Sequence, residues 1–303
     1  RMERRSHYAY LAALALVLFV FSGCMARSTT VRVALSRTYD PGSGVYAELG
    51  NYIFSSSVVR MGMFKPEKFN ETIGFGIFLD EPHEPGRIPI LLVHGHGSGP
   101  RSFEKIASRL DREHFEPWFG YYATGQSIPR TASMLRESLI EAAGKHGVDR
   151  IVILGYSQGG LVTRAALKPA DDGLTLPDVP LLIGLSTPWG GSQAAAIGLE
   201  RASGAPPAWK DMATGSPFIV QLFNDPLPEG TQLHIIYGTG GQNDRFPGKN
   251  DGTIGEPSLA YPEVLAEAES VTVFPAAVHS SMVLDPGPLA MLDGLLDGLR
   301  TDT

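Results

Sequence analysis

Three side chains that lie far apart along the chain have the types needed for covalent acyl chemistry. Ser157 is the central residue of Gly155-Tyr156-Ser157-Gln158-Gly159, which matches the nucleophile pattern G-x-S-x-G. A serine hydroxyl is a weak nucleophile at neutral pH and needs a base within hydrogen-bond reach to accept its proton. A histidine that acts as this base needs a carboxylate to hold its ring in one tautomer. We therefore predict that Ser157 acts together with a histidine and a carboxylate from other parts of the chain.

His279 is the best placed of the eight histidines to be that base. It lies just past the strand predicted at Val271–Phe274. His234 lies inside an apolar run, which predicts a buried structural residue instead. A loop-capping role without catalysis is the alternative for His279.

The carboxylate is expected in the loop after the predicted strand Leu233–Tyr237. Asp251 is preferred there, because the glycine that follows it permits a tight turn that points the carboxylate inward. Asp244, in the same loop, is the alternative, and Asp225 is a more remote one.

Charge that develops on a substrate carbonyl needs preorganised N–H donors. One is predicted to be the backbone N–H of Gln158, directly after the serine. The other is predicted at His96, in the glycine-rich segment His94–Gly99, where the backbone can approach a ligand closely. A metal site built from His94 and His96 is the rival interpretation, but no third ligand accompanies them at a suitable spacing. We therefore predict no metal and no other cofactor.

The elements that must position these residues alternate between apolar, β-rich runs and helical stretches. This alternation predicts an α/β fold with a mostly parallel central sheet and helices on both faces. The predicted strands are Ile73–Leu79, Ile88–His94, Pro117–Tyr122, Ile151–Leu154, Leu181–Ser186, Leu233–Tyr237 and Val271–Phe274. The predicted helices are Phe103–Arg112, Ala132–His146, Gly160–Leu167 and Pro288–Arg300. Ser157 therefore falls in the strand-turn-helix setting that its motif requires.

The stretch from about 189 to 230 interrupts this alternation. It is far longer than the roughly 2–6 residues of a usual connection in an α/β fold, and it contains tryptophans, phenylalanines and several prolines. We predict a small helical cap. Its apolar residues fit either an acyl-binding lid or ordinary core packing.

The N-terminal residues have the three-part layout of an export signal. Arg4 and Arg5 precede the apolar run 10–21, and Ser22-Gly23-Cys24 follows. This end resembles a bacterial lipobox, which implies a signal peptide over 1–23 and a lipid on Cys24. Residues 24–45 would then be a lipidated tether and 46–303 the catalytic domain. The protein is therefore expected to be a membrane-anchored lipoprotein of the bacterial cell envelope. Ordinary secretion to the periplasm or medium and a retained helix are the alternatives.

Composition narrows the classes of function. The formal net charge of −7 argues against a general nucleic-acid binder, whose surface is usually basic. A hydrophobic content of 43% in 303 residues is enough for a sizeable core. With Cys24 as the single cysteine, no disulfide can form within the chain.

Taken in order, these motifs resemble the lipase and esterase branch of the α/β-hydrolases. The resemblance covers about residues 88–300 and includes the Ser186–Ser192 segment, although Trp189 stands where members often have histidine. It implies the α/β-hydrolase fold and cleavage of a small-molecule or lipid ester by Ser157, His279 and Asp251. An acyltransferase, a thioesterase and a non-catalytic lipid-binding lipoprotein are the alternatives.

Overall fold

A single mixed sheet organises the part of the chain that the structure describes. The structure is a computed structural model, and it describes residues 44–169, 173–246 and 248–300. The strands of the sheet lie in the order β1-β2-β4-β3-β5-β6-β7-β8. Their bounds are β1 Val45–Tyr46, β2 Gly76–Leu79, β3 Ile88–Val93, β4 Phe115–Tyr121, β5 Val152–Tyr156, β6 Leu181–Leu185, β7 Gln232–Gly238 and β8 Ala268–Phe274. Each neighbouring pair is parallel except β2 with β4. The carboxyl ends of β3 to β8 therefore meet at one edge of the sheet.

The central strands are apolar at successive positions because both of their faces are covered. Every residue of β5 and β6 is buried. Leu92 of β3 stands in register with Phe119 of β4 on one side and Leu154 of β5 on the other. This is the arrangement that the continuous apolar runs predict.

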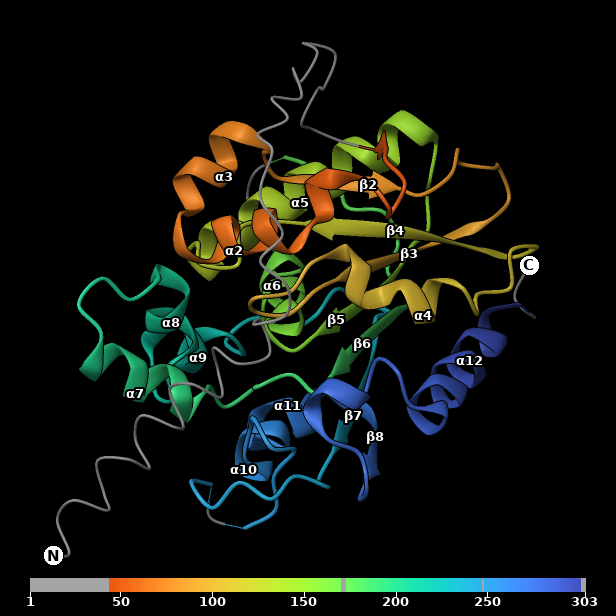
Figure 1. Cartoon of the computed structure of the whole chain (residues 1–303). Helices are drawn as coiled ribbons and strands as arrows, with labels where there is room; N and C mark the ends of the chain where they lie inside the picture. Colours follow the sequence, from red (N-terminus) through yellow and green to blue (C-terminus); the bar gives the residue numbers. More distant parts are fainter. Residues whose placement is uncertain (1–43, 170–172, 247, 301–303) are drawn as a thin grey trace, which may run out of the picture. The chain divides into compact units, whose positions relative to one another are not determined.

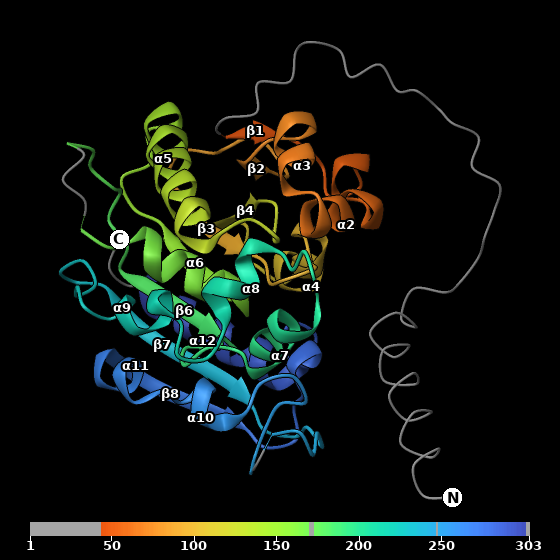
Figure 2. The same cartoon turned by 90° about the vertical axis from the view of Figure 1, so that its left-hand side faces the viewer.

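Helices cover both faces of the sheet (Figures 1 and 2). The α-helices are α2 Ser56–Phe64, α3 Pro66–Thr72, α4 Glu104–Ala107, α5 Ile128–His146, α6 Gln158–Ala166, α7 Gln193–Arg201, α8 Pro207–Met212, α9 Pro217–Gln221, α10 Glu256–Leu259, α11 Pro262–Glu267 and α12 Pro286–Arg300. Helices α5 and α6 pack on one face, and α12 packs on the opposite face, as Figure 2 shows.

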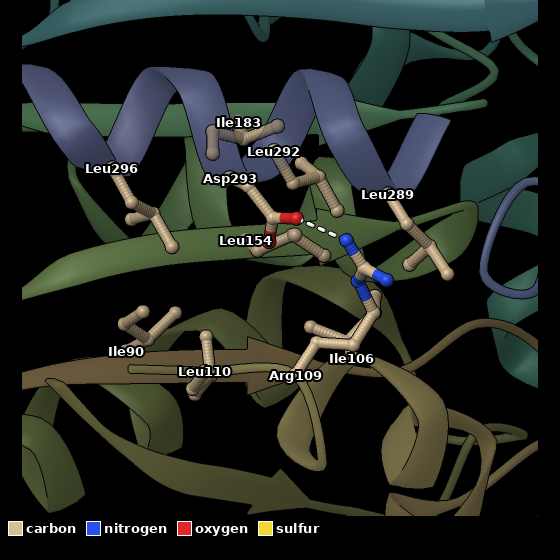
Figure 3. Close-up of a pocket in the computed structure, with 10 residues that line it drawn as sticks. All are labelled: Ile90, Ile106, Arg109, Leu110, Leu154, Ile183, Leu289, Leu292, Asp293 and Leu296. Atoms are coloured by element: carbon tan, nitrogen blue, oxygen red, sulfur yellow. Dashed lines mark hydrogen bonds and ion pairs between the residues drawn. The ribbon is translucent and has the colours of Figure 1, made fainter. Parts of the chain in front are cut away.

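Figure 3 shows how α12 is held on its face of the sheet. Leu289, Leu292 and Leu296 of α12 line a small pocket together with Leu154 of β5 and other apolar side chains. Asp293 forms an ion pair with Arg109, which follows α4. This pocket lies within the packing between helix and sheet, and Ser157 and His279 are not among its lining residues.

Two predicted elements extend well beyond those of the structure. The helix expected over Phe103–Arg112 is wrong beyond residue 107, where the N–H groups of Arg109 and Leu110 donate to carbonyls three residues earlier and the α-helical pattern ends. The strand expected from Ile73 begins at Gly76, since Gly74 has a φ of 81° and breaks the extended backbone.

Helices α7, α8 and α9 occupy the stretch between β6 and β7 and lie together at one side of the sheet (Figure 1). Trp189, Ile219 and Leu222 from this stretch are buried in the main core, and Phe218 and Phe223 pack against it. These five side chains therefore serve core packing. The predicted signal peptide, the tether as far as residue 43 and Cys24 lie outside the described residues. Within the described ranges, no helix has the length and apolar character needed to cross a bilayer.

Candidate active site

The turn at Ser157 is built from close backbone contacts. Ser157 joins β5 to α6 with φ 53° and ψ −123°. A Cβ on Gly155 would lie 2.5 Å from the Cα of Gly160, and one on Gly159 would lie 2.0 Å from the carbonyl oxygen of Val93. Glycine is therefore required at both places for the turn to close. The strained turn fixes the serine hydroxyl at the carboxyl edge of the sheet.

His279 faces this hydroxyl from the loop after β8. Its Nε2 lies 3.0 Å from Oγ of Ser157. The backbone of His279 is held on both sides: its N–H donates to the carbonyl of Asp251 at 2.8 Å, and its carbonyl accepts the hydroxyl of Tyr156 at 3.0 Å. The ring therefore has a fixed position beside Ser157.

Asp251 completes the chain of hydrogen bonds. Its Oδ2 lies 2.6 Å from Nδ1 of His279. Its Oδ1 accepts the backbone N–H groups of Thr253 at 2.9 Å and Ile254 at 2.7 Å. Gly252 has a φ of 92°, so the turn has the left-handed residue on which the preference for Asp251 was based. With Nδ1–H donating to Asp251, Nε2 of His279 is free to accept the serine proton.

The alternative residues lie elsewhere. Asp244 is exposed, and Asp225 forms an ion pair with Lys168. His234 is buried, as predicted, and its Nδ1 lies 2.6 Å from Oγ of Ser270. None of these three has a hydrogen bond to Ser157 or His279 within the described ranges.

The glycine-rich loop after β3 lies directly against the serine. A Cβ on Gly95 would come within 2.8 Å of the Cβ of Ser157 and 3.4 Å of its Oγ. The next residue is His96, whose backbone N–H makes no hydrogen bond to any described residue. Gln158 is the first residue of α6, where backbone N–H groups have no partner within the helix. The structure therefore places both predicted oxyanion donors beside Ser157, His96 in the loop after β3 and Gln158 at the start of α6.

The side chains of the two loop histidines have different surroundings. His94 is fully buried and stacks on Tyr122 with 4.4 Å between ring centroids. Its Nδ1 lies 3.1 Å from the Gly95 carbonyl, and burial lowers its pKa to about 4. His96 has Nδ1 2.9 Å from Oε1 of Gln158, and its Nε2 accepts the indole N–H of Trp209 at 2.9 Å. Both side chains are thus engaged in hydrogen bonds within the protein.

Sequence reasoning missed helix α2, which packs against the loop after β3. A Cβ on Gly99 would lie 2.9 Å from Cγ2 of Val59, and one on Gly97 would lie 3.4 Å from Sδ of Met63. The carbonyl of Gly62 accepts the N–H of Gly125 at 3.0 Å. The available signal was weak, because α2 buries just Val58 and Gly62.

Comparisons with known proteins agree on the fold. No family model matches the chain. A curated relative, a lysosomal thioesterase PPT2 homolog of Drosophila melanogaster, is 26% identical over 190 residues, which are 58% of this chain and 54% of the relative. The chain thus spans about half the length of that relative.

Two solved structures illustrate the match. A Bacillus licheniformis lipase in its mature form superposes with a TM-score of 0.55 at 20% identity, covering 73% of this chain and 97% of that one. A carboxylesterase of the thaumarchaeon Nitrososphaera gargenis gives 0.52 at 14% identity, covering 75% and 96%. The chain has the α/β-hydrolase fold, with the mostly parallel sheet and covering helices that the sequence predicts.

Proposed function

We propose that this chain is a serine hydrolase that cleaves carboxylic esters, with Ser157 as nucleophile, His279 as base and Asp251 as the orienting carboxylate. The observation that carries the proposal is the chain of hydrogen bonds from Ser157 through His279 to Asp251, at 3.0 and 2.6 Å. The likeness in fold to a lipase and a carboxylesterase supports it. No cofactor enters the reaction.

In the proposed reaction, Nε2 of His279 takes the proton of Ser157 as Oγ bonds to the ester carbonyl carbon. The carbonyl oxygen becomes an oxyanion that accepts the N–H groups of His96 and Gln158. The intermediate collapses, the bond to the alcohol oxygen breaks, and the alcohol leaves with the proton from His279. Water then attacks the acyl-enzyme with His279 again as base, and the carboxylic acid is released.

Thioester cleavage is the second candidate, because the curated relative is named a thioesterase. The same three residues would act, and a thiol would leave in place of the alcohol. Activity on acyl-thioesters exceeding that on matched oxygen esters would favour this candidate.

A chain-length series of p-nitrophenyl esters tests the proposal, with the full chain and its Ser157→Ala variant measured side by side. Hydrolysis that is lost in the variant supports it. A preference for long chains indicates a lipase, and one for short chains an esterase. Transfer of the acyl group to an added alcohol would indicate an acyltransferase. Lipid binding without turnover would indicate a non-catalytic protein and contradict the proposal.

We also propose that Cys24 carries a lipid that anchors the protein at the bacterial cell envelope. The support is the signal-like N-terminus and the small residues Ser22 and Gly23 before the cysteine. Labelling in the producing cells with an alkyne fatty acid tests it. Label that persists in a Cys24→Ala variant would contradict it.

A further inference from the structure

Trp209 links the cap to the loop that carries a proposed oxyanion donor. It lies in α8, and its indole N–H donates to Nε2 of His96 at 2.9 Å. Its ring also packs on α7, where a Cβ on Gly198 would approach it to 2.4 Å. One side chain of α8 therefore contacts both α7 and the loop after β3.

The bond from Trp209 determines which nitrogen of His96 carries the hydrogen. An indole N–H only donates, so Nε2 must accept and the hydrogen must sit on Nδ1. Nδ1 lies 2.9 Å from Oε1 of Gln158 and 3.1 Å from the carbonyl of Thr124. The amide nitrogen of Gln158 donates to the same carbonyl at 3.2 Å. A continuous set of hydrogen bonds therefore joins Trp209 to both residues whose backbone N–H groups face the oxyanion in the proposed reaction.

Helix α8 is fixed independently of His96. The backbone N–H of Ala208 donates to the carbonyl of Gly125 at 3.2 Å. Oδ2 of Asp211 accepts the N–H of Ile128, the first residue of α5, at 2.7 Å. The indole N–H is thus held in place by the scaffold before it meets the imidazole.

We propose that Trp209 is a positioning residue, which sets the tautomer and orientation of His96 and, through Gln158, the placement of the two oxyanion donors. The inference rests on the proposed ester hydrolysis. Trp209 itself makes no bond to Ser157 or His279 among the described residues. Its loss should therefore weaken stabilisation of the oxyanion and leave the nucleophile and its base intact.

The groups around His96 favour the same neutral form. A proton on Nε2 would point at the indole N–H of Trp209, so two donors would face each other. Burial of the imidazole also lowers the pKa of His96. A charge on His96 would repel one on His94, because the electrostatic effect of His96 lowers the pKa of His94. Tyr122 stacks on the His94 ring, and the charged residues of α8 are Lys210 and Asp211. Without the indole, water can reach Nε2, so the pKa of His96 should rise toward its ordinary value.

The test compares Trp209→Phe with Trp189→Phe in the full chain. Trp189 is a matched control, because its buried indole nitrogen has no hydrogen-bond partner among the described residues. ¹⁵N-histidine NMR should show His96 protonated on Nδ1 in the wild type and Trp189→Phe. In Trp209→Phe it should show mixed tautomers and a higher pKa. On the p-nitrophenyl ester, kcat should fall about five- to tenfold in Trp209→Phe with little change in KM, as expected for one lost hydrogen bond.

Two results would overturn the proposal: an Nε2-protonated His96 in the wild type, or unchanged His96 signals in Trp209→Phe. Should Trp209→Phe fail to fold, the indole N–H resonance of Trp209 in a His96→Ala variant gives the second measurement. A resonance that does not move contradicts the bond. Absence of esterase activity in the wild type would instead contradict the proposed function, and the NMR result would still decide whether the link exists.

Discussion

Two serines at the ends of neighbouring strands have a similar, positive φ angle but different surroundings. Ser157 follows β5 and Ser186 follows β6, with φ values of 53° and 46°. These are the non-glycine residues with positive φ in the described ranges. The N–H of each continues the ladder to the next strand, from Ser157 to Leu185 and from Ser186 to Ile236, both at 2.8 Å.

The two serines differ in the environment of their hydroxyl groups. Ser157 is half-buried and its Oγ meets the imidazole of His279. Ser186 is fully buried, and its Oγ has no hydrogen-bond partner among the described residues. Strain at a strand end therefore does not by itself identify a nucleophile. A base within reach and access for a substrate do.

The largest effect is expected from Ser157→Ala. Removing the hydroxyl should lower kcat by a factor on the order of 10⁴ or more while the fold persists. Ser186→Ala should leave kcat close to that of the wild type, because no base faces that hydroxyl. Ester hydrolysis and far-UV circular dichroism of both variants check this, and equal losses would abolish the distinction between the two turns.

Asp251→Asn should have the next largest effect, lowering kcat by about 10³-fold or more. Because Oδ1 accepts two backbone N–H groups, the asparagine oxygen must stay on that side and its NH₂ must face Nδ1 of His279. The ring is then forced to carry its hydrogen on Nε2, where it cannot take a proton from Ser157. Asp244→Asn, at an exposed position, is the control. Steady-state kinetics with similar values for both variants would exclude the role of Asp251.

A third strand end, at His94 after β3, is expected to limit stability in acid. Burial lowers the pKa of folded His94 to about 4, against 6.5 in the unfolded chain. As the pH falls below 6.5 the unfolded chain takes up the proton first, so stability is lost between about pH 6.5 and 4. The total is about 3 kcal/mol.

Urea unfolding of the wild type and His94→Asn at several pH values measures this loss. The variant should be less stable at pH 7.5, since it loses the stacking on Tyr122, but it should show a shallower decline in acid. Parallel declines in the two proteins would exclude His94 as the cause.

The smallest expected effect is on stability, in the Ser186→Ala variant. An unpaired buried hydroxyl is unfavourable, so Ser186→Ala should raise the free energy of unfolding by about 1 kcal/mol. Thr163→Ala is a useful contrast, because the Thr163 hydroxyl donates to the carbonyl of Gly160 at 3.0 Å. A loss of stability in both variants would show that the Ser186 hydroxyl has a partner after all.

The sequence predicted the sheet well because its signals are local. Runs such as Ile151–Leu154 are apolar at every position, and they are the strands of the structure to within a few residues. One predicted strand start was wrong: the strand was expected to begin at Pro117, but β4 begins at Phe115. The neighbour β2 pairs with β4 only from Trp118, so Pro117 lies beyond that ladder and is tolerated inside the strand.

The rest of the site depends on contacts between distant segments. Helix α2 and the bond from Trp209 to His96 bring together residues that are far apart in the chain, and no spacing in the sequence encodes them. Ser157, His279 and Asp251 lie close together because they follow β5, β8 and β7, whose carboxyl ends share one edge of the sheet. In the sequence, only the order of the motifs along the chain pointed to this arrangement. Their catalytic roles remain a prediction for experiment.

Labelling with a fluorophosphonate probe, followed by mass spectrometry of the peptides, tests the nucleophile most directly. The wild type should carry the phosphonyl group on Ser157, and His279→Ala should be labelled far more slowly, because the hydroxyl then lacks its base. An unlabelled wild-type protein, or a label on a different serine such as Ser186, would contradict the assignment of Ser157.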